Sequence, residues 1–183
     1  MRIFADMMRH NTLYWLGSLV VAVVLAAGCG ILRQSSEEKR AEEARVAALV
    51  REQLDARQYQ VSIQFMQPRR GPQQAVTSPY SITVDGTHLK SHLPYIGVAY
   101  SLPYGGGKGL TFESEIEEYA EDNSRGDRRL IVFSTDNEED YFVYRLTVFN
   151  NGSADLTVSS KNRESISYRG FLDPDAEINP SSP

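Results

Sequence analysis

The residue with the most distinctive chemistry is the only cysteine of the chain, Cys29. It follows the small residues 26–28, which end a stretch without charged residues that begins at Thr12. Arg2 and Arg9 precede this stretch. A basic start, an apolar middle and small residues before a cut are the layout of a secretory signal peptide. A cysteine directly after such a cut resembles a bacterial lipobox, in which the thiol is acylated.

We therefore expect a lipoprotein signal peptide over residues 1–28 and a lipid anchor at Cys29. Two alternatives stay open. Cleavage at the same bond without acylation would release a soluble secreted protein. Residues 12–32 carry no charge, and about 20 apolar residues suffice to span a bilayer, so an uncut membrane anchor also fits. A single cysteine excludes an intramolecular disulfide and a cysteine-based zinc site.

Glutamates and histidines are the next residues whose side chains could take part in catalysis or metal binding. Glu113, Glu115 and Glu117 alternate along a predicted strand and would share one face. Such a cluster suits cation or glycan chemistry, but three like charges are more simply the solvent side of a strand. His88 and His92 would lie about 13 Å apart along an extended strand, too far to share one metal. The chain has no Gly-x-Ser-x-Gly elbow, and we predict no catalytic residue.

Two loop motifs resemble ligand-binding loops without completing them. Asp136, Glu138 and Asp140 have the alternate spacing of a calcium loop, but the glycine and the distal glutamate that such a loop needs do not follow. Residues 105–109 read Gly-Gly-Gly-Lys-Gly, without the Ser or Thr that follows the lysine of a phosphate loop. A solvated turn and a glycine-rich connection are favoured, so we predict no metal and no cofactor.

A stretch rich in tyrosine, proline and glycine, residues 93–107, is the strongest candidate for binding. It contains Tyr95, Tyr100 and Tyr104. Tyrosines on such loops can line a groove for a peptide, a glycan or a lipid. The alternative is a loop that plugs the core, with hydroxyl groups bonded to the backbone.

A second polar group lies near the C-terminal end of the chain. Asn162, Arg163 and Tyr168 could form a polar site, since a guanidinium group binds carboxylates well. The alternative is a buried network that holds the last hairpin together. The ligand-binding hypothesis therefore comprises five residues, Tyr95, Tyr100, Tyr104, Arg163 and Tyr168.

The elements that position these residues follow from periodicity. A helix is predicted over residues 36–57, with an apolar stripe at 3–4 residue spacing in its second half. Period-two alternation and turn signals then predict about eight strands, near residues 59–65, 80–84, 87–93, 110–119, 130–134, 141–149, 154–159 and 165–171. Asp85-Gly86 and Asn151-Gly152 are hairpin signals.

We therefore predict a mainly β fold, an antiparallel sheet, sandwich or open barrel preceded by one helix. The segments are the signal peptide 1–28, a lipidated tether and helix 29–58, a β-domain 59–172 and a disordered tail 173–183. The net charge of −5 disfavours nucleic acid, which needs a clustered basic face.

Two stretches together resemble the family called domain of unknown function 4251 (DUF4251), small lipoproteins of Bacteroidota. One is the tyrosine-rich stretch continued to Phe112, and the other comprises residues 149–154 and 158–170. The resemblance covers about residues 40–172. It implies a lipid-anchored envelope protein and no assigned activity. Residues 30–33 hold no acid, although surface export in these bacteria is associated with acids there, which implies a periplasm-facing outer-membrane position.

The preferred function is that of a non-enzymatic envelope module. It would be held to the membrane by Cys29 and would bind an envelope protein, glycan or lipid. Two alternatives are a hydrolase or other enzyme acting on envelope glycan or peptide, and a purely structural or assembly protein.

Overall fold

The computed structural model describes residues 36–100, 109–137, 139–174, 176 and 178. The chain divides into two units, Met1–Ala44 and Arg45–Pro183. The described part of the first unit, residues 36–44, is helical. The second unit holds the rest of that helix and all the described strands. None of the helices in the described ranges has the length and apolar content that crossing a membrane requires.

The helix occupies residues 36–55 of the described chain, which confirms the predicted element. Within the second unit, Val50 and Leu54 are buried and Val46 packs partly against the core. This is the apolar stripe that the spacing predicts. Arg57 ends the helix region with a φ of 52°, in the left-handed region that L-residues seldom adopt.

Ten strands follow the helix in the described part of the chain, against about eight predicted. Their bounds are β1 (Gln58–Pro68), β2 (Gln74–Ala75), β3 (Ser81–Asp85), β4 (His88–Leu93), β5 (Leu110–Glu115), β6 (Glu118–Asp122), β7 (Arg128–Asp136), β8 (Tyr141–Phe149), β9 (Ser153–Ser160) and β10 (Ile166–Leu172).

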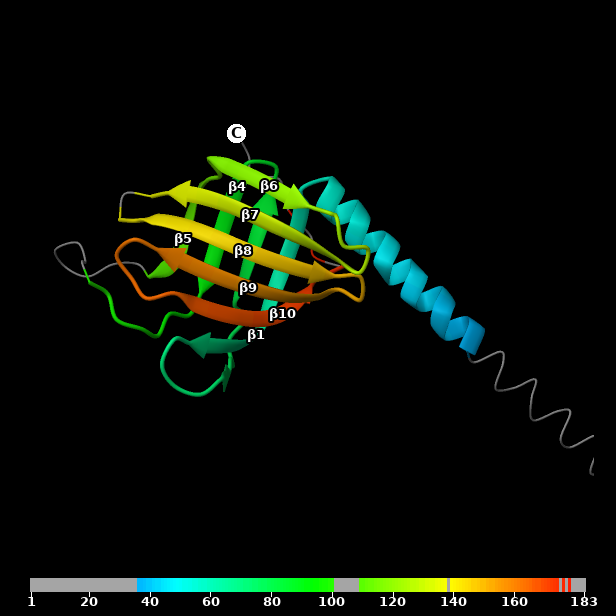
Figure 1. The fold of residues 1–183 in the computed structure, drawn as a ribbon, viewed down its shortest axis with the longest axis horizontal. Coiled ribbons are helices and arrows are strands. Elements are labelled where there is room, and N and C mark those ends of the chain that lie inside the picture. Colours follow the sequence, from blue (N-terminus) through cyan, green and yellow to red (C-terminus); the bar gives the residue numbers. More distant parts are fainter. Residues whose placement is uncertain (1–35, 101–108, 138, 175, 177, 179–183) are drawn as a thin grey trace, which may run out of the picture. The chain divides into compact units, whose positions relative to one another are not determined.

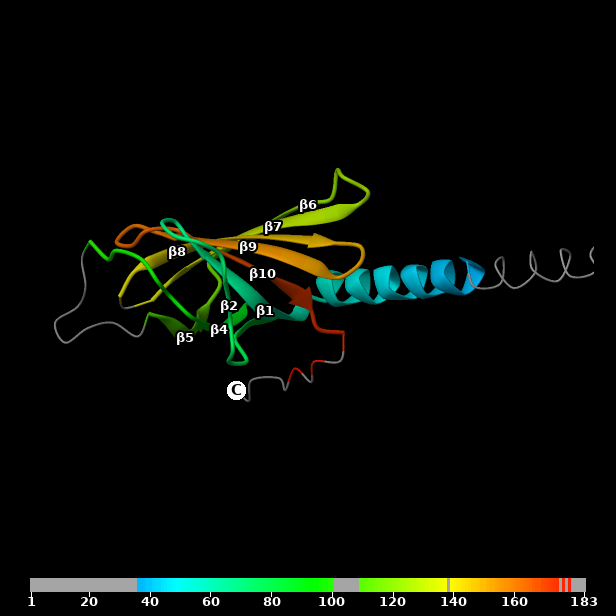
Figure 2. The same ribbon diagram turned by 90° about the horizontal axis from the view of Figure 1, so that it is seen from below.

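Nine of these strands form one antiparallel sheet in the order β5-β4-β3-β1-β10-β9-β8-β7-β6, and β2 pairs with β1 beside it. The sheet curls into a half-barrel, so that β4 and β5 lie behind β7 and β8 (Figures 1 and 2). The predicted mainly β, antiparallel class is confirmed, in the form of an open barrel.

The inside of the curl is the hydrophobic core. Strand β8 alternates between buried and more exposed residues along its whole length, as a half-buried strand must. The largest fully buried side chains of the core include Tyr59, Phe133 and Tyr144. The rings of Phe133 and Tyr144 are stacked, with their centroids 4.8 Å apart. The helix residue Leu54 belongs to the same cluster, so the second half of the helix covers part of this core.

The prediction of one strand over residues 110–119 is wrong. The chain pairs with β4 as β5, leaves that ladder at Ile116, and then pairs with β7 as β6. The Ile116 amide donates to the Thr87 carbonyl at 2.7 Å, and the Glu117 amide donates to the Ser134 carbonyl at 2.9 Å. The chain therefore passes from one edge of the curled sheet, β5, to the other edge, β6, at Ile116 and Glu117.

Strand β1 carries an irregularity in its pairing with β10, between Ile63 and Phe65. Gly170 lies opposite Ile63 there. A Cβ atom on Gly170 would lie 2.9 Å from the Ser62 carbonyl carbon and closer still to its oxygen. Only glycine permits this approach of the two backbones.

The two predicted hairpin turns are confirmed. Gly86 lies between β3 and β4 with a φ of 62°, and Gly152 lies between β8 and β9 with a φ of 82°. The Asn151 side chain accepts a hydrogen bond from the Ser153 amide at 3.0 Å. Glycine and asparagine in these places supply the turn geometry that a tight hairpin needs.

The first residues of the predicted tail are hydrogen-bonded to the domain. The Asp173 amide donates to the Gln60 carbonyl at 2.9 Å. The Gln53 side chain lies within hydrogen-bond distance of the carbonyls of Asp173 and Pro174. Most of the tail beyond Pro174 lies outside the described residues, as do the signal peptide and Cys29.

Candidate functional site

The tyrosine-rich loop lies against the segment that joins β9 and β10. Ala99 forms an isolated antiparallel bridge with Arg163. The Tyr100 amide donates to the Asn162 carbonyl at 2.7 Å, and the Glu164 amide donates to the Val98 carbonyl at 3.0 Å. These bonds pair the backbones of the two segments, which are the stretches that carry the family resemblance.

Tyr95 folds back over its own loop. Its hydroxyl group lies 3.2 Å from the Val98 carbonyl and 3.1 Å from the Glu164 carbonyl. Burial raises the pKa of this hydroxyl. A Cβ atom on Gly97 would lie 2.6 Å from the Tyr95 hydroxyl oxygen, so glycine is needed for this fold-back. The Tyr95 side chain is therefore mainly a structural support of the loop.

Arg163 is the centre of the contact between the two segments. Its side chain is only 5% exposed, and its guanidinium group lies 3.0 Å from Glu139 and 3.8 Å from Asp140. It also lies over the rings of Tyr95 and Phe142, at 5.9 Å from each centroid. A buried cation held by two carboxylates and two rings is committed to internal contacts.

The carboxylate of Asp140 is used in the same way. It accepts hydrogen bonds from the Asn162 side chain at 3.2 Å and from the Tyr141 amide at 2.9 Å. Asp136 and Asp140 belong to the predicted calcium-like turn, and Glu138 lies outside the described residues. Within the described ranges, no group of three acidic, histidine or cysteine side chains is arranged to hold a metal ion.

Glu164 completes the network from the other side. It is buried, accepts a hydrogen bond from the Val98 amide at 3.2 Å and pairs with Arg70 at 3.3 Å. Tyr168 is also buried, and its hydroxyl donates to the Pro94 carbonyl at 2.6 Å. Burial raises the pKa of Tyr168. Residues 94–100 of the loop are thus tied to the 162–168 segment.

The structure therefore brings Tyr95, Arg163 and Tyr168 together, but as a support whose polar groups face inward. Tyr100 is different, since it is 66% exposed. Tyr104 lies outside the described residues.

Two exposed residues of the loop were missed by reasoning from the sequence. Ile96 is 45% exposed and Val98 is 47% exposed. With Tyr100 they form the loop surface, three large side chains at alternate positions, of which Val98 and Tyr100 have hydrogen-bonded backbones. Their alternation along the chain was the signal that could have predicted it.

An acidic cleft of about 810 Å³ lies between β5 and the end of β7. Five carboxylates line it: Glu113, Glu115, Glu117, Asp136 and Glu139. Glu117 lies in the crossing between β5 and β6, not on the same strand as the other two glutamates. The cleft adjoins the loop through Arg163, which pairs with Glu139 and lies over Tyr95.

The histidines lie along β4 beside these glutamates. His88 is 3.7 Å from Glu113 and 3.4 Å from Glu115, and His92 is 3.3 Å from the Thr111 hydroxyl. The pKa of Glu113 is lowered, first by its hydrogen bond to Lys90. The pKa of Glu115 is lowered by hydrogen bonds to Thr87 and His88. A general acid at neutral pH needs the opposite shift.

Fold and loop together define a class: a curled antiparallel sheet, covered in part by one helix, with a long connection between β4 and β5 that is bonded to the β9–β10 connection. The model of the DUF4251 family, a domain of unknown function, matches residues 38–172. The chain belongs to this family.

A solved structure supports the fold. The crystal structure of a DUF4251 family protein from Bacteroides eggerthii is similar to this chain with a TM-score of 0.56 and 20% sequence identity. The similarity covers 72% of this chain and 89% of the other. A comparison with curated proteins gave no match.

Proposed function

We propose that this protein is a non-enzymatic envelope lipoprotein that binds a protein partner through the loop surface. The observation that carries the proposal is the combination of exposed apolar side chains and a fixed backbone. Ile96, Val98 and Tyr100 are 45 to 66% exposed, while the backbone of residues 98–100 is paired with residues 162–164. Such a preorganised surface loses little conformational entropy on binding.

A protein segment fits this surface better than a glycan or an anionic lipid. Two of its three side chains, Ile96 and Val98, are aliphatic: they offer no hydrogen bonds and no ring face to a sugar, but they pack well against apolar side chains. The adjoining acidic cleft repels anionic headgroups. Lys90 partly balances Glu113, at 3.0 Å. We therefore expect a partner segment that combines apolar residues with basic ones.

Photo-crosslinking in intact cells tests the loop surface and identifies the partner in the same experiment. A benzophenone amino acid at position 98 or 100 should give a discrete crosslinked species that mass spectrometry identifies. The matched control is position 130, because Leu130 is also an exposed large apolar residue, at 38%, on another part of the sheet. Equal crosslinking from positions 100 and 130 would contradict the proposal.

The anchor is the second part of the proposal. It rests on the signal-peptide layout that ends at Cys29, and we place the domain on the periplasmic side of the outer membrane. Metabolic labelling with palmitate should mark the wild-type chain and not Cys29→Ala, and protease added to intact cells should leave the labelled protein uncut. Label retained by Cys29→Ala would contradict acylation at Cys29. Digestion of the protein in intact cells would contradict the periplasm-facing position.

A further inference from the structure

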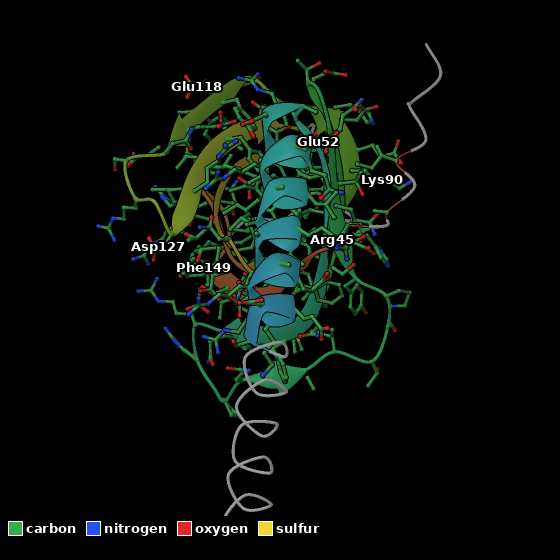
Figure 3. All side chains as sticks on the ribbon, turned by 90° about the vertical axis from the view of Figure 1, so that its right-hand side faces the viewer. Arg45, Glu52, Lys90, Glu118, Asp127 and Phe149 are labelled. Carbon is green, nitrogen blue, oxygen red and sulfur yellow. The ribbon has the colours of Figure 1, made fainter. Side chains whose placement is uncertain are left out.

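A smaller pocket, of about 200 Å³, lies between the helix and the β6–β7 hairpin. Val50, Leu54 and Val148 are its apolar lining. Figure 3 shows this end of the domain, with Asp127 and Phe149 on one side of the helix. We call it the arginine pocket after its charged lining residues, which are Arg51, Arg125, Arg128 and Arg129.

The charge of this lining is positive, whereas the net charge of the whole protein is negative. The chain carries a formal net charge of −5. All four charged residues among the described residues that line the pocket are nevertheless arginines. They come from separate segments, Arg51 from the helix and the others from the β6–β7 turn and β7. Like charges brought together by folding repel one another unless an anion lies between them.

Two of the arginines are partly balanced by carboxylates. Arg129 pairs with Asp55 at 2.7 Å and with Glu121 at 3.4 Å. The Arg128 Nε atom is 3.4 Å from the Asp127 carboxylate, but it is buried and makes no hydrogen bond with the described part of the chain. Asp127 therefore balances the charge of Arg128 only in part.

The other two arginines are free to bind a ligand. In the ranges that the structure describes, Arg51 and Arg125 pair with no carboxylate within 4.0 Å. Arg125 contributes to the lowered pKa of Asp122, but the main cause is the hydrogen bond from the Ser124 amide. The hairpin turn that carries Arg125 is itself fixed, because the Asn150 side chain donates to the Gly126 carbonyl at 2.9 Å.

We propose that the arginine pocket binds a phosphate group. A guanidinium group presents its N–H donors in a planar fork that matches oxyanions. A tetrahedral phosphate offers acceptors in several directions, which suits cations that arrive from the helix and from the hairpin, whereas a carboxylate presents a single planar edge. The pocket shares no residue with the loop surface, so the inference is independent of the proposed function.

The phosphate could belong to a free anion or to a lipid headgroup, and calorimetry separates the two sources. The full chain in neutral detergent micelles is titrated with inorganic phosphate at low ionic strength, with chloride as the reference anion. In a second titration the micelles contain phosphatidylglycerol, with phosphatidylcholine as the reference lipid. Low salt is needed because screening weakens exposed charge pairs.

Arg51→Gln and Arg125→Gln are the informative variants, because neither removes an ion pair of the folded domain. Each should weaken binding about tenfold or more, as expected for the loss of a charge-assisted hydrogen bond. The matched control is Arg69→Gln, which removes one charge from an exposed arginine of the β1–β2 loop and should leave binding unchanged.

Three outcomes decide the proposal. Binding of inorganic phosphate that depends on Arg51 and Arg125 supports a site for the free anion. Selective binding of phosphatidylglycerol with the same dependence, without binding of inorganic phosphate, supports a site for a headgroup. The proposal is overturned if neither inorganic phosphate nor phosphatidylglycerol binds. It is also overturned if Arg69→Gln weakens binding as much as the pocket variants do, because binding would then depend on the overall charge of the protein and not on the pocket.

Discussion

Replacement of Arg163 by alanine should destabilise the whole domain. Arg163 is 5% exposed in its side chain, and its partners Glu139 and Asp140 are 18% and 1% exposed. Removal of one partner from a buried ion pair leaves an uncompensated charge, which costs about 3 to 5 kcal/mol. Because Glu139 reaches solvent in part, we expect a loss near the lower end, about 3 kcal/mol.

Urea unfolding followed by circular dichroism measures this loss. In a domain of this size, about 3 kcal/mol also corresponds to a fall of about 6 to 12 °C in the melting temperature. Arg163→Lys keeps the charge but not the planar fork, and should retain part of the stability. Arg169→Ala is the matched control, since Arg169 forms an ion pair of 3.2 Å with Asp155 at 65% and 51% exposure.

An exposed pair of that kind contributes about 0 to 1 kcal/mol. If Arg163→Ala cost no more than Arg169→Ala, the ion pairs of Arg163 would be screened as surface pairs are. The reasoning that makes Arg163 the support of the loop would then be refuted.

Two further predictions concern the sheet and the core. Gly170→Ala places a Cβ atom 3.1 Å from the Ile63 Cα and against the Ser62 carbonyl. It should lower the free energy of unfolding by about 3 kcal/mol or more, since backbone has little room to move; a chemical unfolding curve that matches the wild type would contradict the β1–β10 register. Burial raises the pKa of Tyr119 to about 12, so its stabilising contribution is complete below the unfolded value of about 10 and is lost as the pH rises toward 12. Unfolding free energies measured from pH 9 to 12 should therefore fall less steeply in Tyr119→Phe than in the wild type, and identical slopes would contradict this.

Local sequence patterns predicted most of the elements, because alternation and turn residues act over a few positions. The strand Tyr141–Phe149 and the Asn151-Gly152 turn are examples in which the pattern and the structure agree. The crossing at Ile116 was not predictable in this way. The alternation continues through it, and only the curl of the sheet brings its two edges close enough for one chain to change partners.

The candidate site shows the same limit. The residue types of the loop predict the same binding role for Tyr95 and Tyr100. In the structure, Tyr95 supports the backbone and Tyr100 faces solvent. What separates them is the kind of contact with residues 162–164, which lie more than 60 positions away in the sequence: Tyr95 contacts this segment through its side chain and Tyr100 through its backbone amide. The arginine pocket could not be predicted from the sequence either, because Arg51 and Arg125 come close together only when the helix packs on the sheet.

Hydrogen exchange of individual backbone amides tests the central claim most directly, namely that the loop surface is held on a fixed backbone. The amides of Tyr100 and Glu164 donate to carbonyls of the opposite segment, and the Val98 amide donates to the Glu164 carboxylate. We predict slow exchange at all three in the wild type and faster exchange in Arg163→Ala. Exchange as fast as in an unfolded peptide in the wild type would contradict the claim, because the loop would then present no preorganised surface.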